Sequence, residues 1–455
     1  MPKNEFFTIT KHIRHFFVEN FIKYNFIFTT DVMGMIIMGI LVPRFEVDLI
    51  NKAGDWILIY GRRKTGKSYL VRKFVEFDQY YFVSRSGKIF RLTNDRFTFI
   101  TKEVFYEAIQ RDLLEEKTVV VDEFHRLSEE LQDLLQALRP SSKARLILIT
   151  SSLFYVEKIL GPKSPLLGIV TPIQIGMIKP RNIISALSNH IKDAETLLQI
   201  APFAREPLLL NIIHDDQLID DFLARLSLTM KDIVPALIGE IFFEEGRELT
   251  RRYEAIMKAI AVGNHTPAKI ASYISGITSE PLSSSDVKSY LRLLERMGIV
   301  NRIRTYRKNR YLYRIRSPMI WAYYYLDEKL GYGEQETPLE IIKEEIRKLL
   351  PVFYEDFIVE FIAEILGGTI EKILKNEVDG IIKRKKEVIA AIEVKMGNIT
   401  EYEAKKFREK LKSHNIDTPA IIVAKNKIRE PKIVSLTPKD IVEIAKNPEN
   451  LRTLL

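Results

Sequence analysis

Residues 55–68 read DWILIYGRRKTGKS, and this stretch decides the expected fold. Asp55–Tyr60 (DWILIY) is a short apolar run, which is typical of a buried parallel strand. Gly61–Ser68 satisfies the pattern GxxxxGK[ST], and Ser68–Phe77 (SYLVRKFVEF) has the composition of a helix. A strand, a glycine-rich loop and a helix in this order place backbone N–H groups and a helix N-terminus around phosphate oxygens. The stretch therefore predicts a phosphate-binding P-loop.

The residues of this loop have separate expected roles. Glycines permit the turn, Lys67 would reach the β- and γ-phosphates of ATP, and the Ser68 hydroxyl would ligate Mg²⁺. The residues expected to bind the nucleotide are Gly61, Arg62, Arg63, Lys64, Thr65, Gly66, Lys67, Ser68 and Tyr69.

A second apolar run, Thr118–Val121 (TVVV), ends in two acidic residues. Ligands of parallel sheets bind at the carboxyl ends of the strands, which is where these acids would lie. Asp122 is expected to hold Mg²⁺ through water, and Glu123 to orient or deprotonate the attacking water.

A third run, Leu146–Ile149 (LILI), is followed by polar residues. Thr150 or Ser151 would contact the γ-phosphate and act in catalysis. The alternative is that this polar segment supplies the N-cap of a helix that begins near Leu153.

Composition limits the remaining possibilities. The chain has 455 residues, with 69 Lys+Arg against 60 Asp+Glu and a net charge of +9. At about 100–200 residues per domain, this length predicts several domains. Cysteine is absent, which excludes disulfides and thiolate chemistry and is compatible with a reducing cytoplasm. The apolar run Val32–Val42 is shorter than the roughly 20 residues of a membrane-spanning helix, so no membrane segment is expected.

The segments IYGRRKTGKS, VVVDEF, LILITSS and KSPLLG resemble, in order and spacing, the archaeal AAA+-related P-loop ATPases. This family is allied to the signal-transduction ATPases with numerous domains (STAND). Separately, the heavy use of Ile, Lys and Glu in the chain favours a thermophilic source. The resemblance implies a multidomain α/β protein with a parallel-sheet P-loop core, a helical lid, a winged helix and a C-terminal restriction-endonuclease-like domain. The expected limits are 1–42 for an N-terminal extension, 43–179 for the core, 180–248 for the lid, 249–330 for the winged helix and 339–455 for the nuclease-like domain.

The sequence departs from this family at two places. Gly168 and Ile169 follow SPLxG where the family has an arginine, and the lid motif GGxP is replaced by Ala204–Pro207 (AREP). The resemblance implies that Pro207 touches adenine and that Arg205 stands in for the missing cation.

The basic surplus of the chain lies in residues 251–317, which hold fourteen Lys/Arg against four Asp/Glu. The pattern predicts three helices and a hairpin, with a capping box at Ser283 and Asp286 before the third helix. Clustered positive charge on such a module is typical of duplex DNA binding, whereas docking to an acidic protein partner is the alternative. The expected DNA contacts are Lys288, Arg292, Arg302, Arg304, Arg314 and Arg316.

The C-terminal segment contains a second candidate site. A helix is expected at Val352–Leu366, strands around Asp379 and along Glu387–Lys395, and then a basic helix and a further strand. This order, with D-x13-E-x-K, resembles the PD-(D/E)xK nuclease fold.

The chemistry of that fold accounts for the residue types. Asp379 and Glu393 can jointly hold a second Mg²⁺ or a Mn²⁺, and Glu355 can complete the site. Lys395 can orient the attacking hydroxide and neutralise phosphate charge. The alternative is a solvated, charged strand in a non-catalytic domain. The function expected from the whole sequence is an ATP-dependent switch or motor acting on DNA, and the alternative is a nucleotide-gated interaction protein.

Overall fold

The computed structural model describes residues 40–277, 282–373 and 378–454. The expected N-terminal extension, with its apolar run, therefore lies almost entirely outside the described residues. Across the described ranges, no helix combines the length and apolar composition needed to cross a membrane.

The first sheet has seven strands in the order β4-β3-β2-β5-β6-β1-β7. Neighbouring strands from β2 to β7 in this order are parallel, whereas β3 and β4 form an antiparallel hairpin at one edge. One strand, β6, separates the strand that leads into GRRKTGKS from the strand that ends at Asp122. The strands are β1 (Trp56–Tyr60), β2 (Gln79–Val83), β3 (Ile89–Thr93), β4 (Arg96–Ile100), β5 (Thr118–Asp122), β6 (Arg145–Thr150) and β7 (Thr171–Gln174).

Both faces of this sheet are covered, which explains the continuous apolar runs of its central strands. Ile57 and Ile59 pack on one face with residues of α2 and α3, and Trp56 and Leu58 pack on the other with residues of α4, α5 and α6. The helices are α2 (Glu46–Lys52), α3 (Lys67–Phe74), α4 (Lys102–Leu114), α5 (Glu129–Leu138) and α6 (Leu153–Ile159), with short 3₁₀ turns at Phe124–Arg126 (η1) and Arg139–Ser141 (η2).

A helical segment follows the first sheet. The expected capping box is present at Ser283 and Asp286, where it begins α12. The elements are α7 (Pro180–Leu187), α8 (Ala194–Ala204), the 3₁₀ turn η3 (Pro207–Ile212), α9 (Ile219–Glu244), α10 (Arg251–Ala261), α11 (Pro267–Ile277), α12 (Ser284–Arg296), α13 (Pro318–Leu330) and α14 (Leu339–Leu366).

The second sheet also has seven strands, in the order β14-β13-β12-β11-β10-β8-β9. The hairpin β8–β9 follows α12 and is continuous with the C-terminal strands, because β10 pairs in parallel with β8 at Glu371↔Arg304 and Lys372↔Thr305. The elements are β8 (Val300–Thr305), β9 (Tyr311–Ile315), β10 (Thr369–Ile373), β11 (Val378–Arg384), β12 (Glu387–Val394), α15 (Glu401–Ser413), β13 (Ala420–Val423), β14 (Ile433–Leu436), α16 (Pro438–Lys446) and α17 (Glu449–Leu454).

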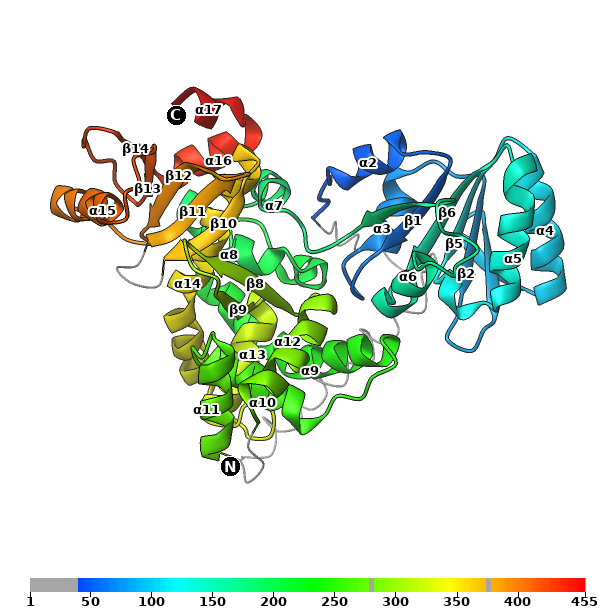
Figure 1. Cartoon of the computed structure of the whole chain (residues 1–455), viewed down its shortest axis with the longest axis horizontal. Helices are drawn as coiled ribbons and strands as arrows, with labels where there is room; N and C mark the ends of the chain where they lie inside the picture. The colour runs from blue at the N-terminus through cyan, green and yellow to red at the C-terminus, as the bar shows by residue number, and fades with distance from the viewer. Residues whose placement is uncertain (1–39, 278–281, 374–377, 455) are drawn as a thin grey trace, which may run out of the picture.

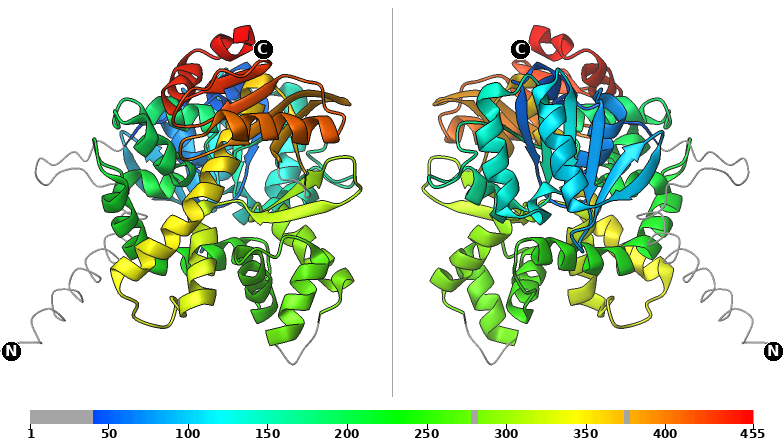
Figure 2. Two further views of the ribbon diagram at one scale, coloured as in Figure 1. Left: turned by 90° about the vertical axis from the view of Figure 1, so that its left-hand side faces the viewer. Right: turned by 90° about the vertical axis from the view of Figure 1, so that its right-hand side faces the viewer.

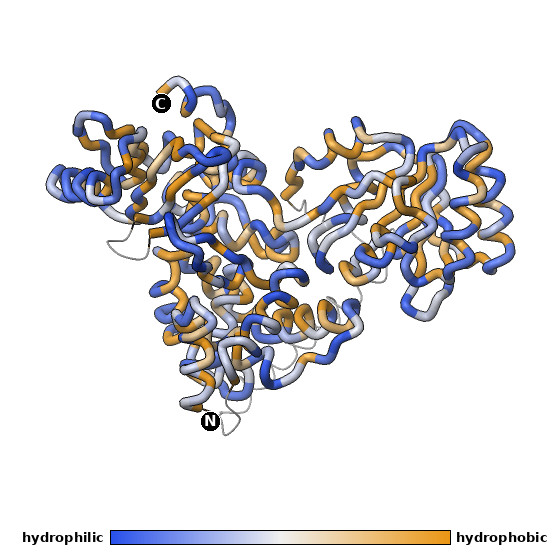
Figure 3. Tube along the Cα trace, in the orientation of Figure 1, coloured by the Kyte–Doolittle hydropathy of each residue, from blue (hydrophilic) through white to orange (hydrophobic). Residues whose placement is uncertain are grey.

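The chain thus forms two α/β parts. The first sheet with its helices stands to one side, and the helical segment and second sheet form the other part (Figure 1). Figure 2 shows α16 and α17 at one end of this second part and α10–α12 at the other. Hydrophobic residues follow the central strands of both sheets (Figure 3). One hydrophobic cluster extends from Ile40 to Leu451, so the helical segment and the C-terminal strands share a core as well as a sheet.

Candidate functional site

The loop after β1 has the backbone that its glycines were expected to allow. At Gly61, an added Cβ would lie 2.0 Å from the carbonyl oxygen of Ile175, so no larger residue fits there. Gly66 has φ +87°, in the left-handed region that favours glycine, and it lies directly before α3. Pro207 lies beside this loop, since its Cγ is 3.7 Å from a Cβ built on Gly66.

The Lys67 ammonium is held inside the loop. Its Nζ donates hydrogen bonds to the carbonyl oxygens of Gly61 at 2.9 Å and Arg62 at 3.0 Å. Burial lowers the pKa of Lys67 to about 8, against the opposing effect of the nearby Glu123 and Asp122 carboxylates. A cation enclosed by loop backbone in this way is positioned to meet phosphate oxygens.

Asp122 lies at the end of β5, close to the first turn of α3. Tyr80 donates a hydrogen bond to its Oδ2 at 2.7 Å, while its buried Oδ1 has no hydrogen-bond partner. Burial, together with the charge of Glu123, raises the pKa of Asp122, and a hydrogen bond from Ser68 opposes this shift. A carboxylate oxygen without a partner beside a serine hydroxyl is a donor set that suits Mg²⁺, so these two residues would hold the ion.

Glu123 follows Asp122 in a left-handed backbone conformation, with φ 57°. Ser151 donates a hydrogen bond to its Oε2 at 2.8 Å, and Arg63 pairs with its Oε1 at 3.1 Å. Arg63 also pairs with Glu240 and Glu244 of α9, each at 3.0 Å. The expected catalytic carboxylate is therefore part of an ion-pair network that connects the P-loop to α9.

His125 extends this network. Its Nε2 lies 3.1 Å from Glu244, and its Nδ1 lies 3.0 Å from the hydroxyl of Thr150. Carboxylate and imidazole atoms of Glu123, His125 and Glu244 lie within 4.8 Å of one another, but Arg63 and Arg126 already neutralise the two glutamates. The group is an ion-pair cluster and not a favourable cation site.

At the polar end of β6 the helix cap that the sequence offered as an alternative is present, and the phosphate contact stays a prediction. Thr150 and Ser151 contact His125 and Glu123, as described above, whereas Ser152 caps α6 by accepting a hydrogen bond from the Tyr155 N–H at 3.1 Å. The two candidate phosphate-contacting residues are thus not used as helix caps.

The adjacent residues Arg205 and Glu206 each form an ion pair with a different element. Arg62 pairs with Glu206 at 2.6 Å, and both side chains are buried. The neighbouring Arg205 forms two hydrogen bonds with Glu360 of α14 at 2.7 and 2.6 Å, and its Nε donates to the Ile178 carbonyl. Arg205 is therefore engaged by α14, and this arrangement does not supply the replacement cation that the family resemblance implied.

The C-terminal carboxylates approach one another between α14, β11 and β12. Asp379 raises the pKa of both Glu355 and Glu393, after the larger effect of burial, and each glutamate reaches a pKa of about 7. Asp379 accepts a hydrogen bond from the Val394 N–H at 2.7 Å, and Lys395 lies 3.7 Å from Glu393. The buried Oε2 of Glu393 has no hydrogen-bond partner.

This carboxylate site is looser than the cluster at His125. Among the described residues, only Glu123, His125 and Glu244 bring one ligand atom each within 4.8 Å of one another, so the ligand atoms of the three C-terminal acids are more widely spaced. Carboxylate oxygens are nevertheless the ligands that Mg²⁺ and Mn²⁺ prefer, and the unpartnered Glu393 oxygen fits such an ion.

The candidate DNA contacts divide into two groups. Lys288, Arg292, Arg302 and Arg304 are exposed, although Arg302 pairs with Glu295 at 3.2 Å. Arg314 instead forms an ion pair with Asp356 of α14, and Arg316 is partly buried in a cavity beside α14.

Several residues of these sites carry no local sequence signal. Glu240, Glu244, His125 and Arg126 were not expected at the nucleotide site, because no motif marks them and their contacts depend on how α9 packs. Of these, His125 and Arg126 lie just beyond the acidic pair that ends β5, so proximity to that pair is the one available indication.

The parallel sheet, the P-loop and the acidic pair at the end of β5 define the core of a P-loop ATPase. Residues 53–167 match the family model described as an AAA domain. This part of the chain is therefore similar to an AAA domain and has the fold of a P-loop ATPase core.

Similar proteins were also found over longer stretches. MJECL04 of Methanocaldococcus jannaschii is 26% identical over 339 residues, which are 68% of this chain and 73% of that protein. The Walker-type ATPase PABY2304 of Pyrococcus abyssi is 18% identical, with a TM-score of 0.46 over 62% of this chain and 96% of that chain. The Aeropyrum pernix ORC2 protein, in ADPNP–ADP complexes, is 13% identical, with a TM-score of 0.36 over 68% of this chain and 95% of that chain.

Proposed function

We propose that this protein hydrolyses ATP, acts on duplex DNA and carries a metal-dependent site for phosphodiester cleavage in its C-terminal part. The observation that carries the proposal is the approach of Glu355, Asp379 and Glu393 to one another beside Lys395. Three partly or fully buried carboxylates repel one another unless a cation joins them, and this repulsion supports a role in metal binding.

Each residue of the C-terminal site then has a chemical role. Asp379 and Glu393 hold Mg²⁺ or Mn²⁺, and Glu355 provides a further oxygen. The bound ion supplies electrostatic stabilisation of the phosphate. The ammonium of Lys395 neutralises phosphate charge and orients the attacking water.

The nucleotide site supports hydrolysis by its own residues. Lys67 contacts the phosphates, Ser68 and Asp122 hold Mg²⁺, and Glu123 orients water. Because Arg63 pairs with Glu123, Glu123 can orient water only when this pair rearranges. Thr150 and Ser151 lie close enough to this network to contact the γ-phosphate side of the site.

DNA binding rests on the exposed basic residues of the segment 251–317, which we interpret as a winged helix. Lys288 and Arg292 lie on the outer face of α12, and Arg302 and Arg304 lie on β8. An alternative function, a nucleotide-gated switch that docks an acidic partner, is favoured by one observation. The hairpin is built into the second sheet, so it is less free to enter a DNA groove than an isolated wing.

The decisive experiment is a cleavage assay on the full-length protein. Plasmid and single-stranded DNA are incubated with Mg²⁺ or Mn²⁺, with and without ATP. Cleavage is expected to disappear in the Asp379→Ala/Glu393→Ala protein and to persist in Glu387→Ala, a matched control at the exposed start of β12. Cleavage that survives in the double variant would refute the assignment of the site. Salt-insensitive binding to a protein partner, without cleavage by the unmutated protein, would favour the alternative.

A further inference from the structure

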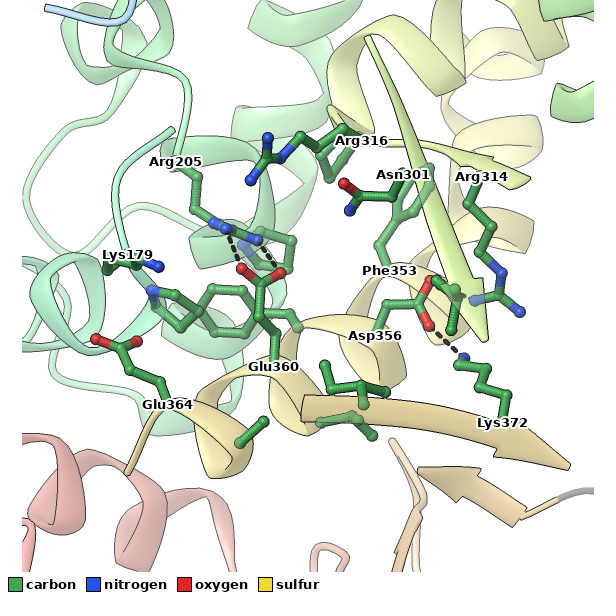
Figure 4. Close-up of a pocket in the computed structure, with 18 of the residues that line it drawn as sticks. Lys179, Arg205, Asn301, Arg314, Arg316, Phe353, Asp356, Glu360, Glu364 and Lys372 are labelled. Carbon is green, nitrogen blue, oxygen red and sulfur yellow. Dashed lines mark hydrogen bonds and ion pairs between the residues drawn. The ribbon is translucent and has the colours of Figure 1, made fainter. Parts of the chain in front are cut away.

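A cavity of about 710 Å³ lies between the helical segment, the hairpin β8–β9 and α14. Its charged lining is unbalanced: six cationic side chains face three carboxylates. The cations are Lys179, Arg205, Arg302, Arg314, Arg316 and Lys372, and the carboxylates are Asp356, Glu360 and Glu364. Figure 4 labels all of these groups except Arg302 and shows them arranged around one space, with Asp356 and Glu360 on α14.

Two of the three carboxylates already pair with cations of the lining. Glu360 is held by Arg205 through two hydrogen bonds, and Asp356 is held by Lys372 at 2.5 Å and by Arg314. These pairs hold the pKa of Asp356 at about 2, because its two cationic partners outweigh the effect of burial. The third carboxylate, Glu364, accepts a hydrogen bond from the Arg181 N–H at 3.2 Å and lies near the Lys179 ammonium.

Among the described residues, two cations of the lining form no ion pair: Lys179, which lies over the Phe45 ring, and Arg316. The Arg316 guanidinium forms no hydrogen bond or ion pair with any described residue, and Figure 4 shows it pointing into the cavity near Arg205. The nearest carboxylates, Glu360 and Glu206, are paired with Arg205 and Arg62. Burial lowers the pKa of Arg316, which expresses the cost of keeping this charge out of water. An unpaired cation in such a position is costly unless an anion joins it.

We propose that this cavity binds a small phosphate-bearing ligand of the nucleotide class, whose phosphate pairs with Arg316. Guanidinium groups suit phosphate because they present several N–H donors in one plane. The volume falls within the range of about 300–1,000 Å³ that is usual for small-molecule sites. The buried rings of Trp321, Phe353 and Phe357 provide an apolar wall for the uncharged part of the ligand.

The position of the cavity gives such a ligand a route to both candidate sites. Arg205 precedes Glu206, which pairs with Arg62 of the P-loop. On α14, Asp356 faces the cavity, while the preceding Glu355 faces the C-terminal carboxylates. The ligand would thus bind between the nucleotide site and the carboxylate site, and it is distinct from the ATP held by Lys67.

The test uses the full-length protein with Lys67→Ala, which disables the P-loop phosphate contact. Calorimetric titration with inorganic pyrophosphate and with AMP, at low salt and without Mg²⁺, is expected to detect binding of at least one probe. Adding Arg316→Met should weaken that binding at least tenfold. Arg310→Ala, an exposed change on the same hairpin that does not line the cavity, should leave the affinity unchanged.

Thermal unfolding separates a binding role from a structural one. Without a probe, the Arg316→Met protein should be at least as stable as its parent, because the substitution removes an unpaired charge. The probe should raise the melting temperature of the parent but not that of Arg316→Met. The proposal is overturned if neither probe binds, if Arg316→Met keeps the affinity, or if Arg316→Met lowers stability without a probe. A loss of duplex DNA binding in place of probe binding would assign Arg316 to DNA and also overturn it.

Discussion

The contribution of Glu244 to the free energy of unfolding measures how strongly its ion pairs hold α9 against the nucleotide site. Its side chain is 5% exposed and contacts Arg63, Arg126 and His125. Burial raises its pKa, but a hydrogen bond with His125 and the charges of Arg63 and Arg126 outweigh that effect and lower the pKa from 4.5 to about 2. A difference of this size corresponds to about 3 kcal/mol of stability at neutral pH.

The sign of the pH dependence follows from the direction of the shift. Because the folded-state pKa is lowered, the unfolded protein binds the extra proton first as the pH falls. The stabilisation is therefore complete above about pH 5 and is lost as the pH decreases towards 2. Glu244→Gln should lower the free energy of unfolding by up to about 3 kcal/mol at pH 7, and this difference from the unmutated protein should shrink at pH 3.

Urea denaturation of both proteins at pH 7, 5 and 3 provides the measurement. Glu240→Gln is the matched control, since Glu240 contacts the same Arg63 but its side chain is 30% exposed. A partly exposed pair of this kind is expected to contribute less than about 1 kcal/mol. The electrostatic reasoning would be refuted if Glu244→Gln lowers the free energy of unfolding by less than that value at pH 7. It would also be refuted if the decrease is the same at every pH.

Three further outcomes are expected. Glu206→Gln should lower stability by about 3–5 kcal/mol in urea denaturation, because it leaves its buried arginine partner without a counter-charge; a loss under about 1 kcal/mol would contradict this. Lys67→Ala should abolish or greatly weaken ATP binding in a fluorescent-nucleotide titration, whereas Asp122→Asn should mainly reduce Mg²⁺-dependent turnover. Unchanged ATP affinity in a folded Lys67→Ala protein would refute the assignment of Lys67 as a phosphate contact. Replacing Arg302 and Arg304 by Ala should flatten the log–log salt dependence of DNA binding by about 0.9 per lost contact, and an unaltered slope would favour protein docking.

The local structure of the nucleotide site was predictable from the sequence because its signals are local. A strand of continuous apolar residues, a glycine-rich loop and an acidic pair each depend on residues that are adjacent in the chain. The capping box of Ser283 and Asp286 was predictable for the same reason. These features can be predicted without knowing which elements pack against them.

The contacts of the charged residues were not predictable in this way. Alternation along β8 and β9 indicates which face a residue occupies, but it does not reveal that α14 covers Arg314 and Arg316. The hairpin β8–β9 is joined to the C-terminal strands through β10, more than fifty residues later in the chain, and no pattern within either segment specifies that pairing. The acids of α9 that bind Arg63 are similarly distant from it in sequence.

The three consecutive residues Arg205, Glu206 and Pro207 connect these distant elements. Arg205 binds Glu360 of α14, Glu206 binds Arg62 of the P-loop, and Pro207 lies beside Gly66. Adjacent residues are joined by planar peptide units, so a displacement of Glu206 or Pro207 displaces Arg205 as well. A change in the P-loop that moves Arg62 therefore acts on α14 through one short segment. Since α14 also carries Glu355 and Asp356, the covalent chain itself provides a mechanical connection from the nucleotide site to the C-terminal carboxylates.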